Sequence, residues 1–125
     1  MKLEYLAIGS IECPLIRLYG FDQAEVRELR QLVKSLSAGS LQEVSLKEKS
    51  WIQSVGGCDV TFRVGDRDES IRQHGPLSFE CVLASDGWKN VEGLLEPFCE
   101  PNASGYQWLI HSGKISLLLS HSGQW

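Results

Sequence analysis

Apolar residues recur at three- and four-residue steps in two stretches of the chain, which is the spacing that places side chains on one face of an α-helix. The first stretch lies between Asp22 and Gly39, and its apolar positions are Val26, Leu29, Val33 and Leu36. Asp22 and Glu25 have the spacing of a capping box, and Gly39 can take the left-handed conformation that often follows a helix. The pattern predicts a first helix between these two caps.

The second stretch predicts a helix from about Asp86 to Glu96. Its apolar stripe is formed by Trp88, Val91, Leu94 and Leu95, and Phe98 continues it. Pro97 should end the regular helix, because the residue before a proline is pushed out of helical geometry.

Alternation of apolar and polar residues predicts strands in the rest of the chain. Residues 3–9 and 14–20 are expected to be two strands joined by a short connection. Three further strands are expected before the second helix, at EVSL (43–46), CDVTFRVG (58–65) and LSFECVLA (77–84).

The last predicted element is a hairpin that turns at Ser112 and Gly113. A two-residue turn there pairs Ile110 with Ile115, Trp108 with Leu117, and Tyr106 with Leu119, so that apolar and aromatic side chains gather on one side. The other side then carries Leu109 and Leu118. A strand that is apolar on both sides is usually covered on both, so either helices cover both faces or a second copy of the chain covers one. We favour a partner, in the simplest case a second copy, as the cover of these two leucines.

These elements predict one α+β domain over residues 1–125. The expected architecture is a two-layer sandwich in which a mostly antiparallel sheet, in the order ββα-βββ-αββ, carries both helices on one face. A length of 125 residues suits a single domain.

The charge pattern narrows the classes of partner. The net charge is −4, and residues 80–100 contain five acidic residues against the single base Lys89, which accounts for the whole excess. The chain has no basic run, so binding to nucleic acid or to an anionic membrane surface is not expected. No apolar stretch is long enough for a membrane span or a signal peptide, and we expect a cytoplasmic protein.

The residues that most often carry chemistry have no recognisable spacing. The four cysteines, Cys13, Cys58, Cys81 and Cys99, form no C-x-x-C pair, and we expect free thiols. The motif HSG occurs twice, at His111 and His121, and the predicted hairpin keeps the two imidazoles apart, so we interpret both as turns. The loop GDRDES at 65–70 is interpreted as a solvated turn. We therefore predict no catalytic residue, cofactor or metal site.

Two functions are consistent with this pattern. The favoured one is a non-catalytic interaction protein that binds a basic protein partner, associates with itself, or does both. Its candidate partner-binding residues are Glu92, Glu96 and Glu100 of the acidic region, Leu109 and Leu118 of the hairpin, and Trp125. The alternative is a small enzyme or ligand-binding domain with a pocket between sheet and helices.

Overall fold

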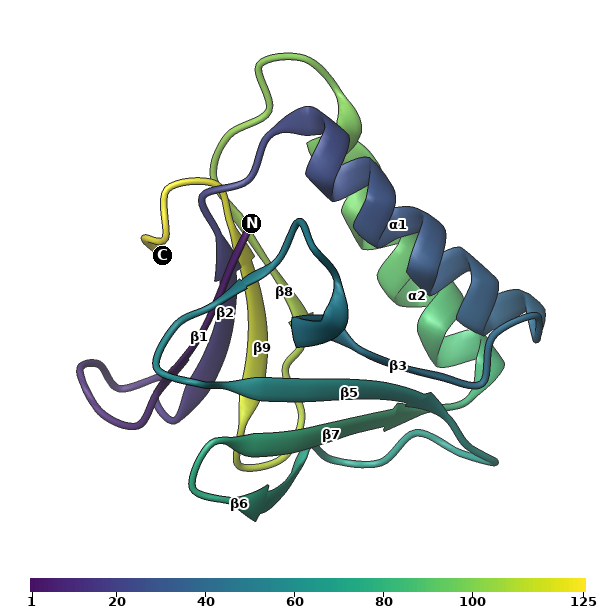
Figure 1. Ribbon diagram of the computed structural model, residues 1–125, viewed down its shortest axis with the longest axis horizontal. Helices are drawn as coiled ribbons and strands as arrows, with labels where there is room; N and C mark the ends of the chain where they lie inside the picture. Colours follow the sequence, from purple (N-terminus) through teal and green to yellow (C-terminus); the bar gives the residue numbers. More distant parts are fainter.

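Two small sheets and two helices surround one core in the computed structural model, which describes residues 1–125 (Figure 1). The strands of the two sheets run across one another: β5 and β7 lie horizontally in Figure 1, whereas β1, β2 and β9 are steep. Both helices lie on the same side of the molecule, where they face the core. The predicted α+β class is confirmed.

The first sheet has five strands. Its spatial order is β4 (Gln53–Ser54), β1 (Lys2–Leu6), β2 (Leu15–Tyr19), β9 (Ser116–Ser120) and β8 (Tyr106–Ile110). The pairs β1–β2 and β8–β9 are antiparallel, as predicted, whereas β1–β4 and β2–β9 are parallel.

The second sheet has four strands. Its spatial order is β3 (Glu43–Ser45), β5 (Asp59–Val64), β7 (Ser78–Leu83) and β6 (Arg72–Gly75). Its central pair, β5–β7, is parallel, and both edge pairs are antiparallel. Four of the seven strand pairs are antiparallel, so the pairing is mostly antiparallel, as predicted. The expectation of a single sheet was wrong, since the chain forms two sheets and has five rather than three strands between its helices.

The helices follow their local sequence signals closely. Helix α1 spans Gln23–Ala38, and its Asp22–Glu25 capping box and left-handed Gly39 are both present. Helix α2 spans Ser85–Leu95 and continues as a 3-10 turn, η2 (Glu96–Cys99). A second 3-10 turn, η1 (Leu46–Glu48), follows β3. Neither helix is both long and apolar enough to cross a bilayer.

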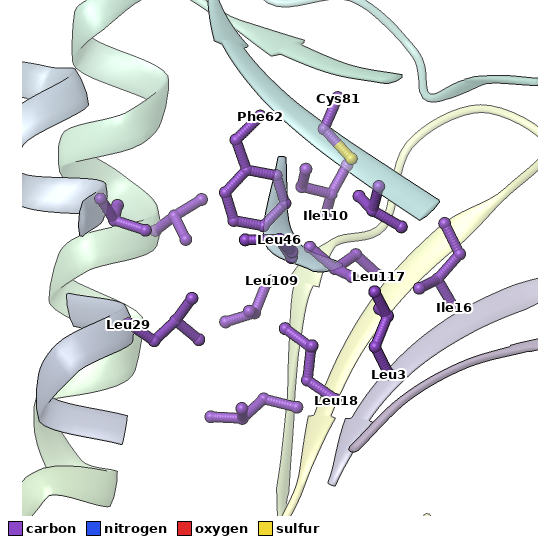
Figure 2. Packing of buried hydrophobic residues seen from close by; sticks show 14 of the residues in the cluster. Leu3, Ile16, Leu18, Leu29, Leu46, Phe62, Cys81, Leu109, Ile110 and Leu117 are labelled. Carbon is purple, nitrogen blue, oxygen red and sulfur yellow. The ribbon is translucent and has the colours of Figure 1, made fainter. Parts of the chain in front are cut away.

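The core fills the space between the two sheets and the helices. Figure 2 shows Leu29 of α1 facing Phe62 of β5 and the leucines of the first sheet. Trp88 of α2 is fully buried, packs against the Phe62 ring at 4.7 Å between centroids, and donates its indole N–H to the Arg63 carbonyl oxygen at 2.9 Å. A buried tryptophan needs such an acceptor, because an unpaired indole N–H would be costly in the core.

The predicted hairpin register was wrong by one residue over most of its length. Trp108 lies opposite Leu118 rather than Leu117, and beyond a β-bulge between Trp108 and Ile110 the partner of Ile110 is Leu117 rather than Ile115. The extra residue in the bulge is Leu109. Because a bulge shifts the alternation, Leu109 joins Ile110 and Leu117 in the core, whereas Trp108 turns to the outer face of the sheet.

Both HSG motifs form turns. Gly113 and Gly123 have φ values of 83° and 88°, in the left-handed region that glycine adopts without steric cost. The connection between β8 and β9 is longer than the predicted two-residue turn and includes residues 111–115.

Candidate functional site

A groove with a volume of about 480 Å³ runs between α2 and β8. We call it the α2–β8 groove. In Figure 1, β8 is the strand of the first sheet that lies nearest the helices. The apolar side chains that line the groove are Leu83, Val91, Leu94, Trp108, Leu109 and Ile110, and the other lining residues are Asp68, Asp86, Gly87, Asn90, His111 and Ser112.

The helical wall of the groove follows from the four-residue repeat of α2. Asp86, Asn90 and Leu94 are four positions apart, so they project along one side of the helix. Asp86 and Asn90 are exposed, and Leu94 is half-buried. The same helix points Glu92 and Glu96 elsewhere, toward α1. The groove therefore has a polar rim above an apolar floor.

The strand wall carries an aromatic pair, Trp108 and His111. The bulge at Leu109 turns Trp108 out of the core, and the half-buried indole meets the imidazole of His111 edge to face, with centroids 4.5 Å apart. Tryptophan at the rim of an apolar groove provides a large contact surface that loses little conformational entropy on binding. Trp108 is therefore the residue on this wall best suited to anchor a ligand.

The acidic loop GDRDES contributes Asp68 to the lining of the groove, and it is not merely a solvated turn. Oδ1 of Asp68 accepts the backbone N–H of Ala84 at 2.9 Å, which satisfies one of the free donors at the start of α2. Gly87 makes this approach possible, because a Cβ atom there would collide with the Asp68 carboxylate. Gly113, in the connection between β8 and β9, leaves space for Ser70 in the same way, so the loop packs against both α2 and this connection.

The lining of the groove carries negative charge only. Asp68 and Asp86 contribute two carboxylates, and no lysine or arginine lines the groove. A ligand with positive charge would therefore be favoured over one with negative charge, and the attraction would weaken as salt is added.

The structure brings two of the predicted partner-binding residues into internal ion pairs. Arg30 of α1 donates from Nε to Glu92 Oε1 at 2.8 Å, and its Nη2 lies 3.9 Å from Glu96 Oε2. Glu92 is only 17% exposed, whereas Glu96 is 63% exposed. Much of the acidic face of α2 is thus neutralised within the chain. Glu100 is exposed and lines a separate hollow of about 440 Å³ at the start of α1.

The expectation that Leu109 and Leu118 need a partner to cover them was wrong. Leu109 is in the core and reaches only the floor of the groove. Leu118 is 0% exposed on the other face of the sheet, where its register neighbours are Trp108 and Arg17. The chain itself supplies the cover, because sequence alternation shows that a strand needs burial on both sides but does not show what buries it.

The C-terminal residues form part of this cover. Arg17 Nη1 donates to the carbonyl oxygen of Gly123 at 2.7 Å, and Gly123 N–H donates to Ser120 Oγ at 3.0 Å. Trp125 is half-buried, and its indole N–H points to Glu12 Oε2 at 3.4 Å. The residues after β9 therefore fold back over the outer face of the five-stranded sheet.

The cysteines are free thiols, as predicted, and three of them are buried. Burial raises the pKa of Cys58 to about 11 and also raises the pKa of Cys81. Both thiols are therefore protonated at neutral pH and behave as small apolar core residues. No group of three or more His, Cys, Asp or Glu side chains is placed to hold a metal ion.

No family model, no curated protein and no solved structure matches the chain.

The sequence allowed a pocket between sheet and helices as an alternative, but it did not identify the lining residues, because the walls of the groove come from three separated segments. Asp86 was visible as a helix residue, Asp68 as a loop residue and Trp108 as a strand residue. The one signal that could have linked two of them is Gly87, a glycine near the start of a helix and thus a position where another group can approach closely.

Proposed function

We propose that the protein is a non-catalytic, cytoplasmic interaction module that binds a positively charged segment of a protein partner through the α2–β8 groove. The observation that carries this proposal is the composition of the groove: Trp108 beside an apolar floor, two carboxylates, and no basic side chain. Aromatic anchors within a polar rim are typical of protein-binding surfaces.

The shape of the groove favours a protein segment over a small ligand. Its polar residues Asp86, Asn90, His111 and Ser112 are all exposed. Sites for small molecules usually enclose most of the ligand surface. A small molecule bound at this exposed rim would remain open to water. The alternative of a small enzyme or ligand-binding domain therefore has weaker support.

The location proposed here differs from the acidic face that the sequence suggested. Arg30 neutralises Glu92 and reaches Glu96, so these side chains would have to leave an existing partner before they met a new one. No lysine or arginine pairs with Asp86 in the folded chain, and Asp86 is exposed. Asp86 can therefore meet a basic side chain without breaking an internal ion pair.

A nuclear magnetic resonance titration with blocked hexa-arginine as probe tests the proposal. We expect the largest shifts at the Trp108 indole N–H and at residues of the groove, and weaker binding as salt increases. Asp86→Asn should weaken binding by up to roughly fivefold, the range of one partly screened charge pair. Glu48→Gln is the matched control, since it removes one exposed charge from η1. Equal effects of the two variants, or shifts spread over the whole surface, would show non-specific attraction and contradict the proposal.

A further inference from the structure

The four edges of the two sheets are protected to different degrees. Unpaired edge strands tend to pair with other chains, and proteins usually shorten them, charge them or distort them with bulges. Strand β4 has two residues and β3 has three. Strand β6 exposes Arg72 and His74 and has a register shift between Gln73 and Gly75. These three edges are poor templates for another strand.

Strand β8 is the exception. It has five residues, YQWLI, and none of them is charged. Its bulge lies between Trp108 and Ile110, so the segment from Tyr106 to Trp108 keeps regular pairing with β9. Tyr106 is 51% exposed. The free edge of the five-stranded sheet is therefore long enough, uncharged and open at this end.

The ladder shows which backbone groups face that free edge. Residues opposite each other in antiparallel strands alternate between pairs that exchange hydrogen bonds and pairs that do not. His121 N–H donates to the carbonyl oxygen of Gly105, which lies opposite it, at 3.0 Å. The alternation then directs the backbone N–H and C=O groups of Tyr106 and Trp108 away from β9.

A side-chain hydrogen bond agrees with this assignment. The side-chain amide of Gln107 donates to the Trp108 carbonyl oxygen at 3.0 Å, as expected for an oxygen that faces the open edge. Gln107 thus occupies one acceptor on the edge, and a strand arriving from outside would displace it. The N–H groups of Tyr106 and Trp108 are directed to the same side.

The free edge of β8 and the α2–β8 groove share Trp108. Its backbone faces the edge, and its side chain lines the groove together with Asp86 and Asp68. Resting on the function proposed above, we infer that β8 accepts an extended basic segment of the partner as an added strand, whose arginine or lysine side chains reach these carboxylates. Main-chain pairing supplies affinity in this mode of recognition, and alternate side chains supply specificity.

A second copy of the chain is a less suitable occupant of the same edge. Pairing β8 with its own copy would bring two grooves together, each with Asp68 and Asp86 and neither with a basic lining residue. Like charges that face each other across an interface oppose association. Charge complementarity therefore selects a basic segment.

Amide hydrogen exchange on the full chain tests the inference, with a blocked hexapeptide of alternating arginine and valine as probe. The outward amides of Tyr106 and Trp108 should exchange at least roughly tenfold more slowly at saturating peptide, because each gains a hydrogen-bond partner. The amide of Gln107, which already faces β9, serves as the internal reference and should change little.

A pair of variants at Tyr106 separates backbone pairing from side-chain contact. Tyr106→Ala removes the ring and keeps the N–H, whereas Tyr106→Pro removes both at an edge position that spares the β8–β9 ladder. We expect proline to weaken peptide binding by a further factor of roughly three to ten relative to alanine, the worth of one hydrogen bond. If the proline variant does not fold, the exchange measurement on the natural chain decides.

Each result has a distinct meaning. Binding that depends on Asp86 but leaves the exchange of Tyr106 and Trp108 unchanged would overturn strand addition and leave the groove function standing. Failure of both basic peptides to bind would overturn both proposals. Slower exchange of the β8 amides on raising the protein concentration alone would identify a second copy as the occupant and overturn the basic segment.

Discussion

Arg30 of α1 donates a hydrogen bond from Nε to Oε1 of Glu92 on α2 at 2.8 Å, and this ion pair joins the two helices of the protein. The hydrogen bond to Glu92 raises the pKa of the Arg30 guanidinium above its ordinary value. The pair explains how an acidic helix is accommodated in a small domain. Glu92 and Glu96 are like charges four residues apart, and Arg30 lies where it can offset their repulsion.

Loss of this pair should cost stability in proportion to its burial. Glu92→Gln is expected to lower the free energy of unfolding by about 0.5–1 kcal/mol, because Glu92 is mostly buried and directly bonded. Glu96→Gln is the control, since Glu96 is 63% exposed and 3.9 Å from Arg30, and it should change stability by less than about 0.5 kcal/mol. Urea denaturation of both variants measures the difference. Equal losses would show that the bond geometry is unimportant.

Two glycines of α2 should respond differently to alanine. Gly93 has open space around it, so Gly93→Ala should stabilise the helix by roughly 0.5–1 kcal/mol. At Gly87 the added methyl group would push the Asp68 carboxylate away from the Ala84 N–H, and loss of this cap, worth about 1 kcal/mol, should cancel the gain. Thermal and urea unfolding give both values.

A double-mutant cycle tests the cause at Gly87. In an Asp68→Ala background there is no carboxylate to displace, so Gly87→Ala should then stabilise the protein by as much as Gly93→Ala does. If Gly87→Ala still gives no gain in stability without Asp68, the loop does not cap α2 in the way described.

Helix α1 could be predicted in full because its signals are local. The capping box at Asp22 and Glu25, the apolar stripe and the glycine after it lie within eighteen consecutive residues. Each signal acts through backbone groups of the same segment. The structure of this element therefore depends little on the rest of the fold.

The sheets could be predicted only strand by strand. Alternation identified the buried faces of β5 and β7, since Val60, Phe62, Phe79 and Cys81 are all in the core. It carries no information on which strands pair, so it could not reveal the parallel pairs or the division into two sheets. The bulge at Leu109 was invisible for a related reason: two successive apolar residues fit a buried strand as well as they fit a bulge.

Ionisation of Cys58 should make stability depend on alkaline pH. Burial raises its pKa in the folded protein to about 11, whereas the unfolded thiol keeps its ordinary value of 9.0. Between these values the unfolded state releases a proton that the folded state retains, so stability falls as pH rises from about 9 toward 11. The contribution is at most roughly 1.4 kcal/mol per pH unit.

The slope of stability against pH isolates this thiol. Cys58→Ala should flatten the decline above pH 9, whatever it costs at neutral pH, because the slope reports only the proton difference. An unchanged slope in Cys58→Ala would show that other groups, such as Cys81, account for it.

The cover over Leu118 should fail when Gly123 is enlarged. Gly123 and Gly105 both have φ of 88°, so alanine meets the same backbone penalty of roughly 1–2 kcal/mol at either site. Only at Gly123 would the new Cβ also lie 3.1 Å from Arg17 Nη1 and from the Tyr19 ring. Gly123→Ala should therefore cost about 1 kcal/mol more than Gly105→Ala in urea unfolding, since the hydrogen bond from Arg17 to the Gly123 carbonyl would be strained or lost.

The amides of β9 should also exchange faster in Gly123→Ala than in Gly105→Ala, because the residues that fold back over this face no longer hold it closed. Equal losses at the two glycines, with β9 equally protected, would mean that the C-terminal residues rest on the sheet without stabilising it.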